Sequence, residues 1–94
     1  MLLVNEKISQ YLNHLLVERG ASTNTLKAYE RDLRRYERYL EEINCVEITP
    51  QVIFDHVSQL RKSQLSESSI ARAVVALRNF HQFVSNESGI ADPT

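Results

Sequence analysis

Apolar residues recur at every third or fourth position along most of the chain, and no segment alternates apolar with polar residues. The first spacing places side chains on one face of an α-helix, whereas alternation would indicate a strand. The pattern predicts four helices, at residues 6–19, 23–43, 50–63 and 66–86. The expected fold class is all-α, with two crossed helical hairpins in a four-helix domain. Such a crossing would bring the start of the second helix near the start of the fourth.

Each predicted helix carries a stripe of apolar residues that would face a common core. A helix of this kind is stable when its stripe packs against other elements. The stripes consist of Ile8, Tyr11, Leu12, Leu15 and Leu16 in the first helix, Leu26, Tyr29, Leu33, Tyr36 and Leu40 in the second, Ile53, Val57 and Leu60 in the third, and Ile70, Val74, Leu77, Phe80, His81 and Val84 in the fourth.

The predicted helix ends coincide with residues that commonly begin or end helices. Ser22 and Thr49 stand where N-caps are expected, because a hydroxyl can accept a hydrogen bond from a free N–H of the first turn. Pro50 fits a first turn, where the N–H that proline lacks would have no partner within the helix. Gly20 and Gly89 follow the first and last helices, where glycine often ends a helix.

Charge is segregated along a chain whose total charge is close to zero. The 94 residues have a net charge of −1. Residues 22–40 are net +2, residues 59–81 are net +3, and the rest of the chain is net −6. Two basic helices in an otherwise acidic chain suggest two parts of one surface that binds nucleic acid. The alternative interpretation is an ordinary charged face in contact with solvent.

The composition restricts the class of protein further. The single Cys45 rules out an intrachain disulfide and fits a reducing compartment, so we expect a cytoplasmic protein. No apolar run approaches the ~20 residues that a membrane span needs, and no membrane partner is expected. A chain of this length can form one core but not a deep cavity as well, so no small-molecule ligand is expected.

Patterns typical of catalytic and metal sites are not found in the sequence. His14, His56 and His81 are isolated from one another, and none forms the i, i+4 pair of a metal site. There is no glycine-rich phosphate loop and no serine–histidine–acid set with a strained turn. The carboxylates are expected on solvated helix faces, outside any cleft that would shift their pKa. We therefore predict no catalytic residue, no metal site and no cofactor.

One short pattern, S-x-x-[ST]-[LI], opens both basic helices. It reads STNTL at residues 22–26 and SESSI at residues 66–70. The first turn of a helix offers free N–H groups and a positive dipole end, which suit a phosphate. Arg or Lys residues behind short polar groups can hold DNA phosphates or guanine edges. The repeated pattern therefore favours DNA as the ligand.

The residues of this pattern differ in what they predict. Ser22 and Ser66 are explained by helix capping alone, because serine is among the commonest N-caps. Four residues favour a role in binding, since two matching helices carry them: Thr25, Lys27, Ser69 and Arg72.

Two longer segments resemble a known family. Residues 19–36 read RGASTNTLKAYERDLRRY, and residues 65–83 read LSESSIARAVVALRNFHQF. The first resembles the opening of the N-terminal core-binding domain of tyrosine recombinases, the phage integrase family, and in particular its Xer-type members. The second resembles the last long helix of the same domain. The resemblance implies a SAM-like core-binding domain at residues 1–88 and, at 89–94, the start of a linker to a catalytic domain outside this chain.

The resemblance also implies a function. In such recombinases the core-binding and catalytic domains clamp the DNA site, and the second and fourth helices of the former cross the major groove. The strand-cleaving residues belong to the catalytic domain, so the resemblance implies a DNA-binding domain that is not an enzyme by itself. By motif position, the implied DNA contacts are Ser22, Asn24, Thr25, Lys27, Arg31 and Arg34 in the second helix and Ser68, Ser69, Arg72 and Ala76 in the fourth.

The implied partners are a double-stranded DNA recombination site and other recombinase protomers assembled on it. His14 and Arg19 of the first helix are the candidates for contact between protomers. A chromosome-dimer resolvase and a phage or transposon integrase both fit the sequence. The alternative function is a helical protein–protein interaction module without DNA contact, in which Val75 and Phe83 would form an apolar contact.

Overall fold

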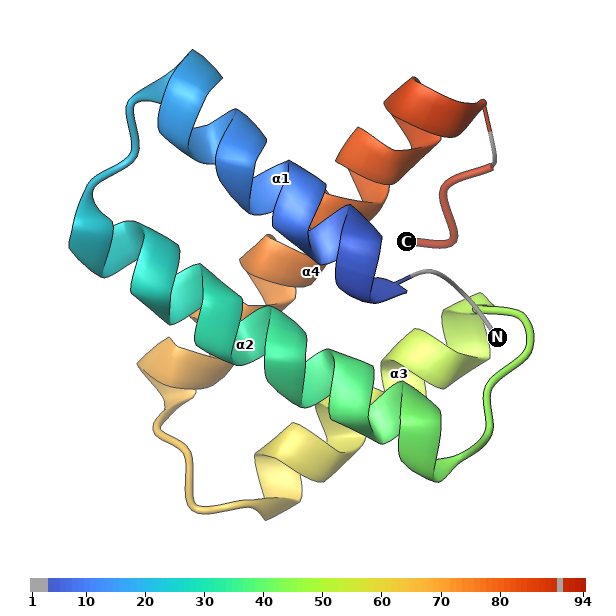
Figure 1. Ribbon diagram of the computed structural model, residues 1–94. Helices are drawn as coiled ribbons and strands as arrows, with labels where there is room; N and C mark the ends of the chain where they lie inside the picture. Colours follow the sequence, from blue (N-terminus) through green and yellow to red (C-terminus); the bar gives the residue numbers. More distant parts are fainter. Residues whose placement is uncertain (1–3, 90) are drawn as a thin grey trace.

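The structure is a computed structural model that describes residues 4–89 and 91–94. It contains the helices α1 (Val4–Arg19), α2 (Thr23–Glu42), α3 (Pro50–Lys62) and α4 (Glu67–Ser88), shown in Figure 1. Each predicted helix end lies within two residues of the observed one. The described residues contain no strand, and the all-α prediction is confirmed. No helix in this part of the chain has the length and apolar character needed to cross a membrane.

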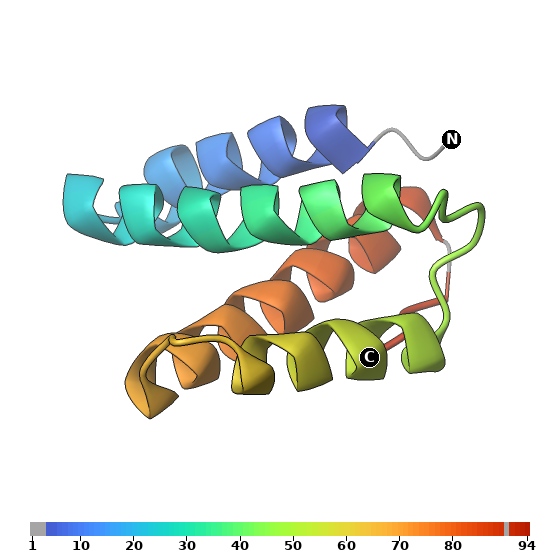
Figure 2. The ribbon, with the colours of Figure 1, turned by 90° about the horizontal axis from the view of Figure 1, so that it is seen from below.

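The helices form two layers that cross each other (Figure 2). Helices α1 and α2 run antiparallel in one layer, and α3 and α4 run antiparallel in the other. Helix α4 lies across the first layer and contacts α1 and α2, while α3 packs against α4. This arrangement confirms the two crossed hairpins. Helix α4 therefore makes most of the contact between the two layers, and His56 of α3 adds ring contacts to Tyr36 and Tyr39 of α2.

The predicted caps form at the ends of the helices. The Ser22 hydroxyl accepts a hydrogen bond from the Thr25 N–H at 3.2 Å, and the Thr49 hydroxyl accepts one from the Val52 N–H at 3.3 Å. Gly89 follows α4 in the left-handed conformation, with a φ of 74°, which side chains other than glycine rarely adopt. Local sequence therefore determines where α2, α3 and α4 begin or end.

The main core lies between the two layers, where α4 crosses α1 and α2. Leu16, which was expected in the α1 stripe, is 53% exposed, so this prediction was wrong. Successive residues of a helix are rotated by about 100°, and position 16 is turned away from α2 and α4 once Leu12 and Leu15 pack against the core. The buried members of this core include Ile8, Tyr11, Leu33, Tyr36, Leu40, Ala76, Leu77 and Phe80.

Tyr36 brings together two histidines that are far apart in the sequence. Its hydroxyl lies 2.8 Å from Nε2 of His81, and the centre of its ring lies 5.1 Å from that of His56. Burial lowers the pKa of both imidazoles to about 4, because an apolar surrounding disfavours the charged ring. Both are therefore neutral members of the core at pH 7. Within the described residues, no three His, Cys, Asp or Glu side chains gather as metal ligands would.

Candidate nucleic-acid interface

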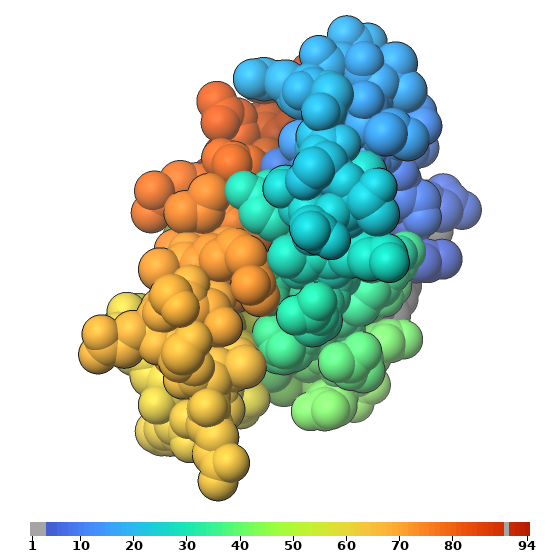
Figure 3. Space-filling model, turned by 90° about the vertical axis from the view of Figure 1, so that its left-hand side faces the viewer, coloured from blue at the N-terminus to red at the C-terminus, as the bar shows by residue number. Residues whose placement is uncertain are grey.

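The N-terminal halves of α2 and α4 lie on one face of the molecule. Figure 3 shows this face, with α2 on its right and the start of α4, together with the loop that precedes it, on its left. In Figure 1 both helices begin at the same side of the molecule. The two segments that share the S-x-x-[ST]-[LI] pattern therefore contribute to one surface.

The start of α4 lies beside the middle of α2 rather than beside its start. Arg72, in the second turn of α4, forms an ion pair with Asp32 of α2 at 2.8 Å. Asp32 comes nine residues after Thr23, the first residue of α2, which corresponds to about 14 Å along a helix axis. The expectation that the two helix starts would be neighbours is therefore corrected. The common face is formed by two staggered helices.

The predicted contact residues in the first turns of α2 are exposed. Asn24, Thr25, Lys27 and Arg31 all reach solvent, and Lys27 and Arg31 are one turn apart. Neither basic side chain forms an ion pair with any residue that the structure describes. The Ser22 hydroxyl, in contrast, is occupied as the N-cap and also donates to Thr25 Oγ1 at 3.0 Å. Positive charge without an ion pair in the described part of the chain therefore lies about one and a half and two and a half turns behind the cap, at Lys27 and Arg31, and again further along α2 at the exposed Arg38.

Arg34 extends from α2 toward α1. Its Nη1 group donates to Asn5 Oδ1 at 2.7 Å and to Glu37 at 3.4 Å, and its Nη2 group donates to Ser9 Oγ at 3.4 Å. The bonds to Asn5 and Ser9 join α2 to α1, the other helix of the first layer. The structure therefore does not bring the guanidinium of Arg34 together with the other predicted contact residues.

The predicted contact residues of α4 lie on two sides of that helix. The Ser66 hydroxyl accepts from the Ser69 N–H at 3.2 Å and lies within hydrogen-bonding distance of the Ser68 and Ser69 hydroxyls, at 3.2 and 3.0 Å. Ser68 is exposed and Ser69 is half-buried. Ala76 is completely buried in the core. The prediction that Ala76 contacts DNA was therefore wrong, because it lies on the face of α4 that packs against the first layer.

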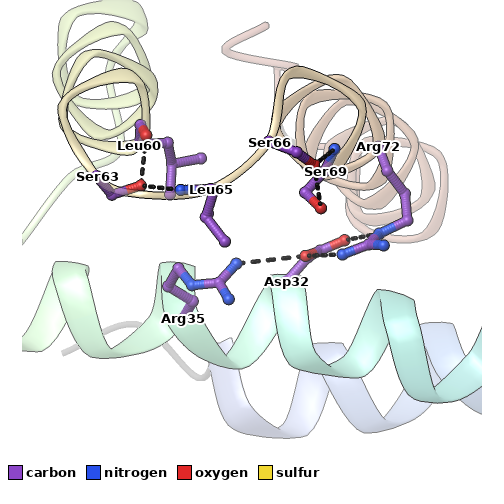
Figure 4. Close-up of polar contacts among 8 residues, drawn as sticks. All are labelled: Asp32, Arg35, Leu60, Ser63, Leu65, Ser66, Ser69 and Arg72. Atoms are coloured by element: carbon purple, nitrogen blue, oxygen red, sulfur yellow. Dashed lines mark hydrogen bonds and ion pairs between the residues drawn. The ribbon is translucent and has the colours of Figure 1, made fainter.

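Asp32 connects two arginines at this surface (Figure 4). Its carboxylate accepts from Nε and Nη2 of Arg72 at 2.8 and 3.0 Å and from Nη1 of Arg35 at 3.4 Å. The Asp32 side chain is 1% exposed, whereas both arginines remain partly exposed. The hydrogen bond to Asp32 raises the pKa of the Arg72 guanidinium above its usual value. The cluster keeps a net charge of +1 next to solvent.

The sequence did not single out Asp32 as the centre of this cluster. Its carboxylate is there only one of the acidic charges of a basic helix. A signal was present, since Asp32 directly precedes the core residue Leu33 and lies one turn from Tyr36. A charged residue at the border of an apolar stripe is expected to be partly buried and paired.

Comparison with known proteins assigns the family. Residues 8–88 match the phage integrase N-terminal SAM-like domain. Tyrosine recombinase XerD of Halalkalibacterium halodurans is 42% identical over 96 residues, which cover 97% of this chain and 32% of the relative. XerD of Staphylococcus epidermidis is 40% identical, with coverage of 97% and 32%, and XerD of Mycobacterium tuberculosis is 36% identical, with coverage of 92% and 30%. No solved structure gives a significant match.

The chain spans about a third of the length of these relatives. The match begins within α1, at residue 8, and ends at residue 88, which is the last residue of α4. This extent agrees with the two motifs that suggested the family, one at the start of α2 and the other in α4. The chain belongs to the phage integrase N-terminal SAM-like domain family.

Proposed function

We propose that this chain is the DNA-binding N-terminal domain of a site-specific tyrosine recombinase, and that α2 and α4 contact the recombination site through the major groove. The observation that carries the proposal is the pair of exposed basic side chains without an ion pair among the described residues, Lys27 and Arg31, in the N-terminal half of α2, the helix that shares a face with the start of α4 (Figure 3). The family match and the relatives named tyrosine recombinase XerD support the recombinase context.

The chemistry of the face suits a division of roles on DNA. Lys27 and Arg31 can neutralise backbone phosphates, which contributes affinity but little sequence information. Asn24, at the exposed start of α2, is of a type that can pair with the edge of adenine. We propose that Ser22, Thr25, Ser68 and Ser69 add short donors near the helix starts, and that Arg72 adds a cation on α4. Arg34 has a smaller role in this proposal, because its guanidinium is bonded to α1.

We further propose residues 1–88 as the core-binding domain and 89–94 as the start of a linker. The left-handed Gly89 at the end of α4 supports this boundary. We propose that strand cleavage is carried out by another part of a longer protein, since the match is to an N-terminal domain and the relatives are about three times as long. A cytoplasmic location is proposed as well, on the basis of the single cysteine.

Other recombinase protomers are the second proposed partner. Two apolar side chains near the C-terminal end of α1, Leu16 and Val17, are exposed beside the exposed Arg19. Apolar side chains next to a charge are typical of the contact between protein partners. His14 is a weaker candidate than the sequence suggested, because its ring packs 5.0 Å from that of Phe83.

The structure favours DNA binding over a protein interaction module that uses α4. That alternative relied on Val75 and Phe83 as an exposed apolar pair. Val75 is exposed, but Phe83 is half-buried against Tyr11, with ring centres 5.4 Å apart. One exposed valine is a small apolar contact, whereas the unpaired cations offer a ready site for phosphate.

Salt dependence of binding to a short duplex tests the proposed function. If about four phosphates are neutralised, the slope of log K against log salt should be near −3.6. The double variant K27Q/R31Q should reduce the magnitude of that slope by about 1.8. The matched control is K7Q/R78Q, which removes two positive charges elsewhere on the molecule. Lys7 and Arg78 each line a pocket that is bordered by α3 and by residues of the segment 91–94. Equal slopes for the two double variants would contradict the proposed surface.

A further inference from the structure

The ion pair between Asp32 and Arg72 links α2 of one layer to α4 of the other. Among the described residues it is the ion pair that joins two helices, whereas the others lie within α2. It is situated where the N-terminal half of α4 crosses the middle of α2 (Figure 4), two helices that share the face shown in Figure 3. The pair therefore connects the crossing of the two layers to the candidate DNA surface.

Stability alone is a weak explanation for a carboxylate buried in this position. Its removal from water is unfavourable, and attraction to Arg72 and Arg35 has to offset that loss. Well-packed apolar residues often stabilise such a position equally well or better. A bidentate arginine–carboxylate pair differs from an apolar contact because it fixes the plane and direction of the guanidinium. Compared with an apolar contact, the ion pair therefore adds a fixed orientation of the Arg72 guanidinium.

We propose that Asp32 is a positioning residue for DNA binding, which sets the direction of the Arg72 guanidinium and the place where α4 crosses α2. This inference rests on the proposed function. The Nε–Nη2 edge of Arg72 faces Asp32, and Nη1 has no hydrogen-bond partner among the described residues. The Arg72 side chain is 33% exposed, so a phosphate oxygen can approach Nη1. An acidic residue thereby serves the binding of a polyanion.

Two effects of Asp32 on DNA affinity have opposite signs and can be separated. As a negative charge near the surface, the carboxylate repels phosphates, and its loss would strengthen binding by charge alone. As the partner of Arg72, it holds the guanidinium in place, and its loss would weaken binding. The inference is that orientation outweighs repulsion at this position.

The test compares the affinities of D32N, D32E, D55N and the unchanged chain for a short duplex at low salt, well below the unfolding temperature. D32N should bind about tenfold more weakly, which is the size of effect that one charge-assisted hydrogen bond supplies. D32E should recover part of the affinity. The control D55N removes the same charge from the exposed side of α3, where Asp55 is bonded to Gln51, and should bind at least as tightly as the unchanged chain.

The outcomes distinguish this inference from the proposed function. If the unchanged chain binds DNA and D32N binds equally well or more tightly, the inference is overturned and the proposed function stands. If the unchanged chain does not bind, the proposed function itself fails, and the inference fails with it. A lower unfolding temperature of D32N with unchanged affinity would assign Asp32 a purely structural role and also overturn the inference.

A second variant keeps the inference testable if D32N does not fold. R72K retains the positive charge but lacks the planar fork that Asp32 holds. It should bind DNA about tenfold more weakly than the unchanged chain while the salt dependence stays the same, because the number of charges is unchanged. Unchanged affinity in R72K would overturn the inference.

Discussion

The starts of α2 and α4 have the same local geometry but place their first basic side chains differently. Ser22 and Ser66 each accept a hydrogen bond from an N–H three residues later, at 3.2 Å in both helices. Behind these caps, Lys27 is exposed without an ion pair, whereas Arg72 is held by Asp32 at 2.8 Å. Local sequence determines the cap, and packing between the layers determines what the basic side chain does.

This difference suggests two kinds of contribution to binding. The start of α2 supplies exposed positive charge without an ion pair to any described residue, whose effect should depend on salt and on the number of charges. The start of α4 supplies an oriented group, whose effect should depend on geometry. The comparison between the two helix starts can therefore be tested by substitution. The substitutions below disturb the contact between α2 and α4, the two caps, or the contact between α1 and α2.

The largest effect is expected at Ala76, which is buried where α4 packs against the first layer. A76R would place a charge without a partner in the core and should reduce the free energy of unfolding by about 3–5 kcal/mol. The matched control is A71R, because Ala71 is exposed on the same helix and its substitution should change stability by less than about 0.5 kcal/mol. Urea denaturation measures both. Equal stability of the two variants would contradict the described packing of α4.

Acid should weaken the second polar contact between α2 and α4, the Tyr36–His81 pair. The folded pKa of His56 and His81 is about 4, below the value of about 6.5 in an unfolded chain, so their contribution to stability is complete above pH 6.5 and is lost as pH falls toward 4. Between pH 7 and pH 5 the loss should be about 2 kcal/mol for each histidine.

Urea denaturation at the two pH values measures this loss. H81Q should reduce the pH dependence by about half, since one of the two buried imidazoles is removed. Equal free energies of unfolding at pH 7 and pH 5 would show that the buried imidazoles are not neutral partners of the core.

The two caps should contribute equally to stability. S22A and S66A should each lower the free energy of unfolding by about 1 kcal/mol, because each leaves an N–H of a first turn without its partner. S22G and S66G should lower it by only a few tenths, and these variants are the matched controls. A clear difference between the free energies of unfolding of S22A and S66A would contradict the structural equivalence of the two helix starts.

The smallest effect is expected for R34Q. Arg34 is partly exposed and bonded to Asn5 and to neighbouring carboxylates, so its loss should reduce stability by about 0.5 kcal/mol. Its effect on DNA affinity should be smaller than that of R31Q, because Arg31 has no ion pair among the described residues. A larger loss of affinity in R34Q than in R31Q would show that the Arg34 side chain gives up its hydrogen bonds to α1 and contacts DNA instead.

Sequence patterns were sufficient to predict the helices and their ends, because helix formation and capping depend on residues that are neighbours in the chain. The 3–4 residue spacing predicted all four helices, and the serine and threonine hydroxyls at 22, 49 and 66 became caps. Errors arose where a position depends on the angle between helices. Leu16 was expected inside and is exposed, and Ala76 was expected at DNA and is buried.

The candidate site was only partly predictable for a related reason. The exposure of Lys27 and Arg31 follows from their place opposite the apolar stripe of α2. The pairing of Asp32 with Arg72 joins residues 40 positions apart, and no local pattern contains that information. Arg34 was likewise expected at DNA from its motif position, although its long side chain reaches Asn5 of α1.

The most direct test of the proposed DNA surface is NMR chemical-shift mapping of the 94-residue chain during titration with a short duplex at low salt. We expect the largest shifts in the N-terminal halves of α2 and α4, at Thr25, Lys27, Arg31, Ser69 and Arg72. Shifts confined to α3 and the end of α4, or no shifts at near-millimolar DNA, would contradict this expectation.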